Sequence, residues 1–343
     1  MRTRVTEVLG IEHPILSAGI PVIGIDLVAA VSSAGGLGIL GATYLSPTEI
    51  REVVATLRGR TTRPFALNLL VPFCTDAQLD ACIEARVPVL STAWGPPDTA
   101  AKRARAAGIP LIHMVTTAEQ GAAAARAGVS VIAAQGSEAG GGLVGPVGGM
   151  VLIPAVVDAV AAATPGSSPP PVVAAGGVAD GRGLAAALTL GAEGVLVGTR
   201  FLATEEASVA PVWKAAICAA RETDTVHTRV GNLVMRPTWA DVAPGRVLRT
   251  RAIEAWLGRE RDLAALPQSE RDAIAARWVQ ARAEGRREET EIIAGQDCGL
   301  IRELLPAAAV VRRIVMEAEE ILRRFATDRA GIVAANPHED ANR

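Results

Sequence analysis

Short apolar runs alternate with longer segments of helical period from residue 14 to about residue 198. The runs are rich in Val, Ile, Leu and Ala, which is typical of buried strands, and the intervening segments are rich in Ala, Leu and Arg. The eight runs are Pro14–Ala18, Leu37–Gly41, Phe65–Val71, Val87–Ser91, Leu111–Val115, Val131–Gln135, Val172–Ala175 and Gly194–Val197. This order predicts repeated βα units around a parallel sheet. Eight units favour a closed TIM (β/α)8 barrel of the α/β class over an open doubly wound sheet.

Helix-capping signals lie between these runs. Ser46 is placed as an N-cap, with Pro47 at the first helical position and Glu49 three residues after the cap. This combination predicts a capping box. The segments TTAEQGAAAARAGV and DGRGLAAALTLGAEGV each place a glycine just before the next run. A left-handed C-cap at these glycines would end the two helices.

The pattern changes after about residue 206. The segment Arg246–Arg287 is dense in charge, has Trp256 and Trp278 as isolated large apolar residues, and predicts helices joined by polar turns. An amphipathic helix follows the sequence GQDCGL, and we expect it to return to the barrel. We therefore divide the chain into a barrel (1–236), a C-terminal helical subdomain (237–295), a turn and returning helix (296–330) and a disordered tail (331–343).

Charge and composition exclude several classes of partner. The chain has 34 basic and 36 acidic residues, and aromatic residues make up only 3% of it. It therefore has neither the cationic field nor the stacking residues that nucleic-acid binding requires. Glu7, Glu12 and His13 interrupt the place where the apolar core of a signal peptide would lie, and no stretch reaches the roughly 18 uncharged apolar residues of a membrane span. We expect a cytoplasmic protein that binds neither nucleic acid nor a membrane.

The four cysteines predict no metal centre. Cys74, Cys82, Cys218 and Cys298 form no CxxC pair and have no histidine cluster nearby at metal-ligand spacing. We expect four reduced thiols and no bound metal.

Two glycine loops follow the last two predicted strands. Gly176 and Gly177 follow Val172–Ala175, and Gly198 and Thr199 follow Gly194–Val197. Loops at the carboxyl ends of the last two strands of a barrel often bind phosphate through backbone N–H groups. The alternative is that these glycines only permit tight turns.

A third glycine cluster follows the sixth predicted strand, in the sequence AAQGSEAGGGLVGPVGGM. We expect a long, pliable loop at the barrel mouth, where active-site loops lie. Glu138 is its one ionisable side chain. A solvated carboxylate is the alternative to a catalytic role for Glu138.

With these loops in place, the chain resembles the nitronate monooxygenases, formerly called 2-nitropropane dioxygenases, which are FMN-dependent TIM-barrel proteins. The resemblance rests on the order and spacing of PILSAGI, AGGLGILGA, FALNLLVP, IHMVTTAEQGAAAARAGVSVIAAQGSEAGGG, AAGGVADGRGLAAALTLGAEGVLVGTRFLAT and GQDCGLIRELLPAAAVVRRIVMEAE. It implies that residues 1–236 form an FMN-binding barrel. The cofactor-binding residues implied are Ala18, Gly19, Ile20, Asn68, Gln135, Gly140, Gly141, Gly176, Gly177, Gly198, Thr199, Gln296 and Gly299.

One departure from the family pattern bears on the chemistry. Members of this type carry a histidine after the two glycines of QGxEAGG, and that histidine is taken as the base that removes a proton from the carbon of a nitroalkane. Here the position is Gly142. An alkyl nitronate is already an anion, so its oxidation could survive the loss, whereas oxidation of a neutral nitroalkane should not.

No other residue clearly replaces that histidine. His113 and Glu138 are weak catalytic candidates, and a hydrogen-bonded barrel histidine is the preferred interpretation of His113. His227 follows the barrel, where a solvated or capping role is favoured. Trp94 ends the fourth predicted strand, in a place suited to covering a substrate pocket.

Three functions remain open at this point. The first is an FMN-dependent oxidoreductase that oxidises an alkyl nitronate or similar stabilised carbanion with O2. The second is a reductase, like the flavin-dependent enoyl-thioester reductases, in which NAD(P)H reduces FMN and an activated alkene takes the hydride. The third is a non-catalytic flavin-binding protein. The partners expected are a small-molecule substrate, O2 or NAD(P)H, and a second copy of the chain in a homodimer. For the helical subdomain, packing back onto the barrel is the alternative to dimerisation.

Overall fold

The computed structural model describes residues 1–334, and its strands form one large parallel sheet and one small antiparallel sheet. The strands of the large sheet are β1 (Ile15–Ser17), β2 (Gly38–Gly41), β3 (Phe65–Leu70), β4 (Val89–Ala93), β5 (Leu111–Val115), β6 (Val131–Gln135), β8 (Val172–Ala175) and β9 (Val195–Val197). Those of the small sheet are β7 (Gly141–Gly142), β10 (Thr225–Thr228) and β11 (Gly245–Leu248). Each strand of the large sheet overlaps one of the eight predicted runs.

The large sheet closes into a barrel. Its strand order is β1-β9-β8-β6-β5-β4-β3-β2. Parallel bridges from Leu16 to Leu37 and from Ile20 to Leu40 join the first and last strands of that order. The predicted (β/α)8 barrel is therefore confirmed.

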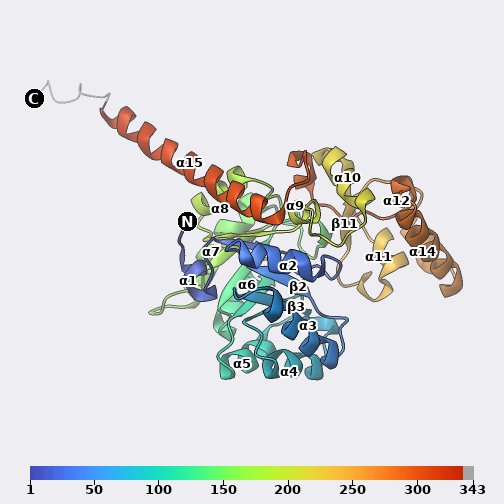
Figure 1. Ribbon diagram of the computed structural model, residues 1–343, viewed down its shortest axis with the longest axis horizontal. Helices are drawn as coiled ribbons and strands as arrows, with labels where there is room; N and C mark the ends of the chain where they lie inside the picture. The colour runs from blue at the N-terminus through green and yellow to red at the C-terminus, as the bar shows by residue number, and fades with distance from the viewer. Residues whose placement is uncertain (335–343) are drawn as a thin grey trace, which may run out of the picture.

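Helices cover the outside of the barrel and fill the C-terminal part of the chain (Figure 1). The α-helices are α1 (Arg4–Leu9), α2 (Gly24–Ser33), α3 (Pro47–Arg60), α4 (Asp76–Glu84), α5 (Asp98–Ala106), α6 (Ala118–Ala127), α7 (Gly149–Ala163), α8 (Gly181–Thr189), α9 (Thr199–Leu202), α10 (Pro211–Ala219), α11 (Val230–Met235), α12 (Arg251–Glu254), α13 (Glu260–Ala265), α14 (Gln268–Ala283) and α15 (Ala307–Ala334). The 3-10 helices are η1 (Val71–Phe73), η2 (Glu222–Asp224), η3 (Pro237–Trp239), η4 (Arg287–Glu289) and η5 (Gln296–Leu300). None of the described helices is long and apolar enough to cross a membrane.

The predicted helix caps are present. The Ser46 side chain accepts a hydrogen bond from the Glu49 N–H, and the Glu49 carboxylate accepts one from the Ser46 N–H at 2.7 Å. Gly128 ends α6 with a φ of 82°, and Gly191 follows α8 with a φ of 92°. Glycine adopts both angles without the strain that a side chain would add.

Apolar side chains fill the barrel from its amino-terminal end. Strand residues such as Leu37, Ile112 and Val173 form one buried cluster with Val5 and Leu9 of α1. Helix α1 therefore closes this end of the barrel. The rim at the carboxyl ends of the strands is left for polar groups.

Helix α15 returns to the barrel and packs between α8 and α2, where an eighth barrel helix would lie. Its first N–H group, at Ala307, donates to the Glu206 carboxylate at 2.8 Å, and Glu317 accepts from the Gly181 N–H at 2.9 Å. Figure 1 shows α15 running along α8 and projecting past it. The helix continues to Ala334, beyond the predicted start of the tail at residue 331, and residues 335–343 lie outside the described part of the chain.

The C-terminal subdomain has a core of its own and is not purely helical. Trp278 is buried in this core with Val230 and Ile253, and Trp256 packs against it. Arg246 and its neighbours form strand β11, so the prediction of helix from Arg246 was wrong at this point. We propose that the subdomain begins with β10 and not at residue 237, because residues from Val230 onward already belong to this core.

The contact between α8 and α15 yields a stability prediction. A Cβ atom at Gly181 would lie 2.3 Å from Cβ of Glu317 and 2.5 Å from the backbone nitrogen of Ala318, so Gly181→Ala must displace α15. We expect it to lower the free energy of unfolding by about 1–3 kcal/mol. Gly59→Ala is the control, because nothing lies within 4 Å of its Cβ position in α3, and alanine there should stabilise the helix by roughly 0.5–1 kcal/mol. Thermal unfolding measures both, and equal shifts would contradict the predicted clash.

Candidate functional site

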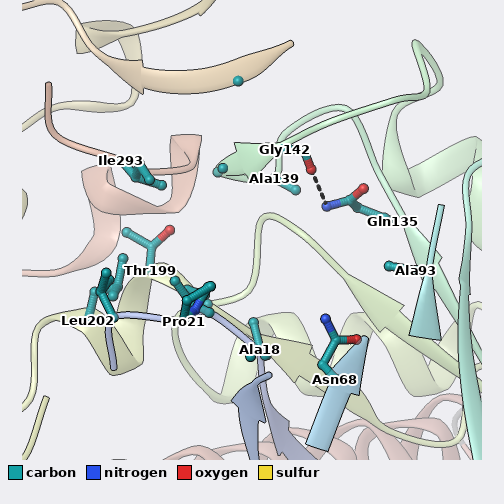
Figure 2. A pocket seen from close by; sticks show the side chains of 18 of the residues that line it. Ala18, Pro21, Asn68, Ala93, Gln135, Ala139, Gly142, Thr199, Leu202 and Ile293 are labelled. Atoms are coloured by element: carbon teal, nitrogen blue, oxygen red, sulfur yellow. Dashed lines mark hydrogen bonds between the residues drawn. The ribbon is translucent and has the colours of Figure 1, made fainter. Parts of the chain in front are cut away.

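A pocket of about 370 Å³ opens at the carboxyl ends of the barrel strands. Its floor and walls come from the ends of β1, β3, β4, β6, β8 and β9, and the C-terminal subdomain covers part of it. Figure 2 shows side chains from these separate strands directed into one space. A strand that ends at the barrel mouth necessarily presents its last residues there.

Asn68 is fixed within the pocket by its neighbour on β4. The Ser91 hydroxyl donates to Asn68 Oδ1 at 2.9 Å, and both residues are buried. This bond occupies the acceptor of the amide and leaves its NH2 group available as a donor. In Figure 2 the Asn68 nitrogen points toward the space between Asn68 and Gln135.

Gln135 ends β6 on the other side of this space. Its Nε2 donates to the Gly142 carbonyl at 3.2 Å, as the dashed line in Figure 2 shows. Its Oε1 is buried and has no hydrogen-bond partner among the residues that the structure describes. This acceptor is therefore available to a hydrogen-bond donor in the pocket.

Glycines form the opposite end of the pocket. Gly176 and Gly177 have φ angles of 91° and 75°, and the Cβ position of Gly198 meets only Ala18, at 3.6 Å. The Thr199 hydroxyl lies beside them and accepts from the Gly295 N–H at 2.9 Å. Left-handed glycines leave backbone N–H groups open to a close ligand, which fits the predicted phosphate loop.

Asp297 lies at the glycine end of the pocket, and the sequence analysis did not identify it. It lines the pocket and is only 6% exposed. Burial raises the pKa of its carboxyl to about 7, partly offset by a hydrogen bond from the Thr199 side chain.

Gln296 and Gly299, which are neighbours of Asp297 in the chain, were predicted to contact the cofactor, and the structure does not place them in the pocket lining. Gln296 is exposed, and Gly299 packs against Glu222.

The other predicted cofactor residues all line this one pocket. They are Ala18, Gly19, Ile20, Asn68, Gln135, Gly140, Gly141, Gly176, Gly177, Gly198 and Thr199. The structure thus brings together residues from six segments of the chain.

The small sheet holds the glycine loop that was expected to be pliable. Gly142 pairs with Gly245 and Gly141 with Arg246, joining β7 to β11. The Arg246 guanidinium also donates to the Ser137 carbonyl at 2.8 Å. The subdomain therefore fixes the loop at the barrel mouth.

The weak catalytic candidates lie outside the pocket lining. His113 is buried in β5 with Nδ1 2.8 Å from the Thr92 hydroxyl, and burial lowers its pKa to about 4. Both Glu138 carboxylate oxygens accept from the Gly149 N–H that begins α7, at 2.8 and 3.0 Å. His227 is exposed on β10. None of the three is placed to act as a base on a ligand in this pocket.

Aromatic side chains form one side of the pocket mouth, and we call Tyr44, Phe73, Trp94 and Trp239 the aromatic wall. The rings of Trp94 and Trp239 meet edge to face, with centroids 4.9 Å apart. Trp239 is nearly parallel to Tyr44 and to Phe73, at interplanar angles of 14° and 9°. All except Phe73 line the pocket. Sequence analysis singled out only Trp94, because the others come from distant loops.

Relatives of known class share this architecture. The family model for nitronate monooxygenase matches residues 2–81 and 73–317. A probable nitronate monooxygenase of Staphylococcus saprophyticus is 32% identical, covering 94% of this chain and 99% of that protein. The (3aS,4S,5R,7aS)-5-hydroxy-7a-methyl-1-oxo-octahydro-1H-indene-4-carboxyl-CoA dehydrogenase of Mycobacterium tuberculosis is 38% identical over 74% of this chain and 68% of that protein.

Solved structures of similar proteins share this fold. FabK from Thermotoga maritima superimposes with a TM-score of 0.81 and 35% identity, covering 95% of this chain and 99% of that one. A nitroalkane oxidase from Streptomyces ansochromogenes gives a TM-score of 0.79 and 28% identity, covering 94% and 100%. The fold and the pocket are thus those of a flavin-dependent oxidoreductase that acts on a small molecule. The chain belongs to the nitronate monooxygenase family.

The buried carboxyl of Asp297 yields a pH prediction. Folding raises the pKa of this carboxyl from 3.8 to about 7, so the folded state favours the protonated form. The stability that the protonated carboxyl contributes is lost as the pH rises through about 7. We expect Asp297→Asn to raise the melting temperature of the flavin-free protein most at about pH 8, less at about pH 5, and little at about pH 4. Asp158→Asn, at an exposed position on α7, is the control and should show no such difference. A pH-independent effect of Asp297→Asn would count against the buried, titrating carboxyl.

Proposed function

We propose that this protein is an FMN-dependent oxidoreductase that oxidises an alkyl nitronate, or a similarly stabilised carbanion, with O2. Family membership supports the reaction class. The glycines at one end of the pocket support FMN, because they form a single cradle suited to one phosphate. A cytoplasmic location and a homodimer stay predictions of the sequence.

The contact between Trp94 and Gly142 carries the proposal. A Cβ atom at Gly142 would lie 2.2 Å from Cζ2 of the Trp94 ring. The indole therefore fills the space that the family's histidine would need. Trp94 adopts a φ of 62°, unusual for a bulky residue, and this backbone conformation directs the ring into that space.

The consequence is a reaction centre without a base. Among the described residues that line the pocket, the ionisable ones are Tyr44, Arg236, Arg282 and Asp297. Burial raises the pKa of Tyr44 further above its ordinary value. The arginines stay protonated, and Asp297 lies at the glycine end beside Thr199. The position beside Gly142 thus holds no base, whereas a nitronate has already lost the proton that such a base would remove.

The residues present can bind and orient such a substrate. Asn68 would donate to a polar edge of the flavin ring, and Gln135 would accept from the ring through its Oε1. Gly176, Gly177 and Gly198 would hold the phosphate. When bound there, a flavin would supply the two-electron redox chemistry between the substrate carbanion and O2. The apolar aromatic wall excludes water from the substrate side.

Anaerobic stopped-flow absorbance tests the proposed reaction. We expect propionate 3-nitronate to bleach the flavin of the FMN-loaded protein, and 3-nitropropionate to leave it oxidised, because only the latter needs a base. Bleaching by NADPH alone would favour the reductase instead. If none of the three reduces the flavin, the nitronate oxidase proposal is wrong.

A paired substitution tests the missing base. Gly142→His alone should lower the melting temperature and reduce flavin binding, because its side chain collides with Trp94. Trp94→Gly with Gly142→His removes the collision and restores a base, so we expect reduction by 3-nitropropionate to rise by roughly 10²-fold or more over the parent. Glycine suits the left-handed backbone at position 94.

Trp94→Gly alone is the matched control for this experiment. It opens the same space without adding a base, so its reduction by 3-nitropropionate should remain at the level of the parent. Equal gains in the single and double variants would show that space, and not a base, limits the reaction.

A further inference from the structure

Arg282 is the cation of the pocket that has no carboxylate partner. Arg236 and Arg282 are the two cationic side chains among the described residues that line the pocket. Arg236 forms an ion pair with Glu291, in which Nη2 lies 2.5 Å from Oε1. Arg282 forms no ion pair with any residue that the structure describes, and its one hydrogen bond there is long, 3.5 Å from Nη2 to the Glu291 carbonyl. The charge of Arg282 is therefore the one that is left for a ligand.

Trp213 supports the guanidinium of Arg282 from one face. The guanidinium carbon lies 4.6 Å from the centroid of the indole, and Trp213 is only 3% exposed. A guanidinium stacked on an aromatic ring is held through its face, so the N–H groups at its edge stay free to donate. Nη1 of Arg282 makes no hydrogen bond with a described residue. The stack thus holds the cation in the pocket wall without neutralising it.

Burial makes this unpaired charge costly. Desolvation lowers the pKa of the Arg282 guanidinium, and its Nε is buried without a hydrogen-bond partner among the described residues. An anion that binds at the guanidinium edge would offset that cost. A carboxylate fits best, because it carries a single negative charge and two oxygens that match the arginine fork.

The part of the subdomain that faces the pocket around Arg282 is apolar. Val247 belongs to the core of the subdomain, and Met235 and Ile293 pack against that core. All three side chains line the pocket. An aliphatic chain attached to the carboxylate would bury its surface against them.

We propose that Arg282 determines substrate specificity by binding a carboxylate at the end of an aliphatic chain, remote from the reacting carbon. This rests on the proposed function in that it names the substrate class of the same pocket. Arg282 acts in binding and has no part in the chemical step. Trp213 acts as a positioning residue for Arg282.

Calorimetric titration of the FMN-loaded protein with hexanoate and hexanamide tests the carboxylate site without turnover. The two probes have the same shape and differ in charge. Hexanoate should bind about tenfold or more tightly than hexanamide, because the charge-assisted hydrogen bonds to Arg282 are lost in the amide. Equal Kd values for the two probes, or binding of neither, would overturn the proposal.

A matched pair of variants on α14 assigns this preference to a residue. Arg282→Gln should weaken hexanoate binding about tenfold or more and leave hexanamide binding nearly unchanged. It leaves the ion pair of Arg236 with Glu291 in place, so no charge is left buried alone. Arg277→Gln removes the same charge from an exposed position of the same helix and should keep the preference for hexanoate. A preference that survives Arg282→Gln, or that both variants reduce equally, would count against the site.

Two substitutions of Trp213 test its positioning role. Trp213→Phe keeps an aromatic face under the guanidinium, so the preference for hexanoate over hexanamide should largely remain. Trp213→Leu removes that face and should reduce the preference severalfold. Equal losses in the two variants would show that the stack does not position Arg282.

The cofactor phosphate is the competing partner for Arg282, and flavin affinity separates the two. If Arg282 binds the substrate, Arg282→Gln should change the Kd values for FMN and riboflavin by the same factor. Weakened binding of FMN alone would assign Arg282 to the phosphate and overturn the proposal. The proposed oxidation fails by a separate observation, the absence of flavin reduction by a nitronate, which would leave the carboxylate site standing.

Discussion

Closure of the parallel sheet is the constraint on which the rest of the structure depends. The bridge from Leu16 to Leu37 brings the first and last strands of the sheet order together, so the carboxyl ends of eight strands surround one opening. Asn68 and Gln135 lie 67 positions apart in the chain and yet face one pocket. Apolar side chains fill the barrel below them, which leaves this rim as the place where polar groups can meet a ligand.

The C-terminal subdomain completes the pocket by backbone contacts that only glycine permits. A Cβ atom at Gly140 would lie 2.4 Å from the backbone nitrogen of Gly295, and Gly142 pairs with Gly245 across the small sheet. These approaches lock the glycine loop to the subdomain. They also bring Asp297, Arg236 and Trp239 to the barrel mouth. The barrel thus supplies the glycine end of the pocket, and the subdomain supplies part of its wall.

An aromatic ring forms the pocket wall beside the glycine loop. Trp94 occupies the space beside Gly142 and packs edge to face on Trp239. An apolar surface at this point raises the cost of separating charge, which is the physical basis of the proposed preference for a substrate that is already ionised at carbon.

The sequence by itself determined the eight strands and the caps of α3 and α6, because periodicity and capping depend on residues a few positions apart. It also singled out the glycine loops that line one end of the pocket. It failed at β11, whose charged residues resemble a helix and whose partners β7 and β10 lie elsewhere in the chain. It predicted that Gln296 contacts a cofactor; in the structure Gln296 is exposed, and Asp297 of the same turn lines the pocket. Only the tertiary structure decided these points and the contact of Trp94 with Gly142, because each depends on which distant segments come to share the same space.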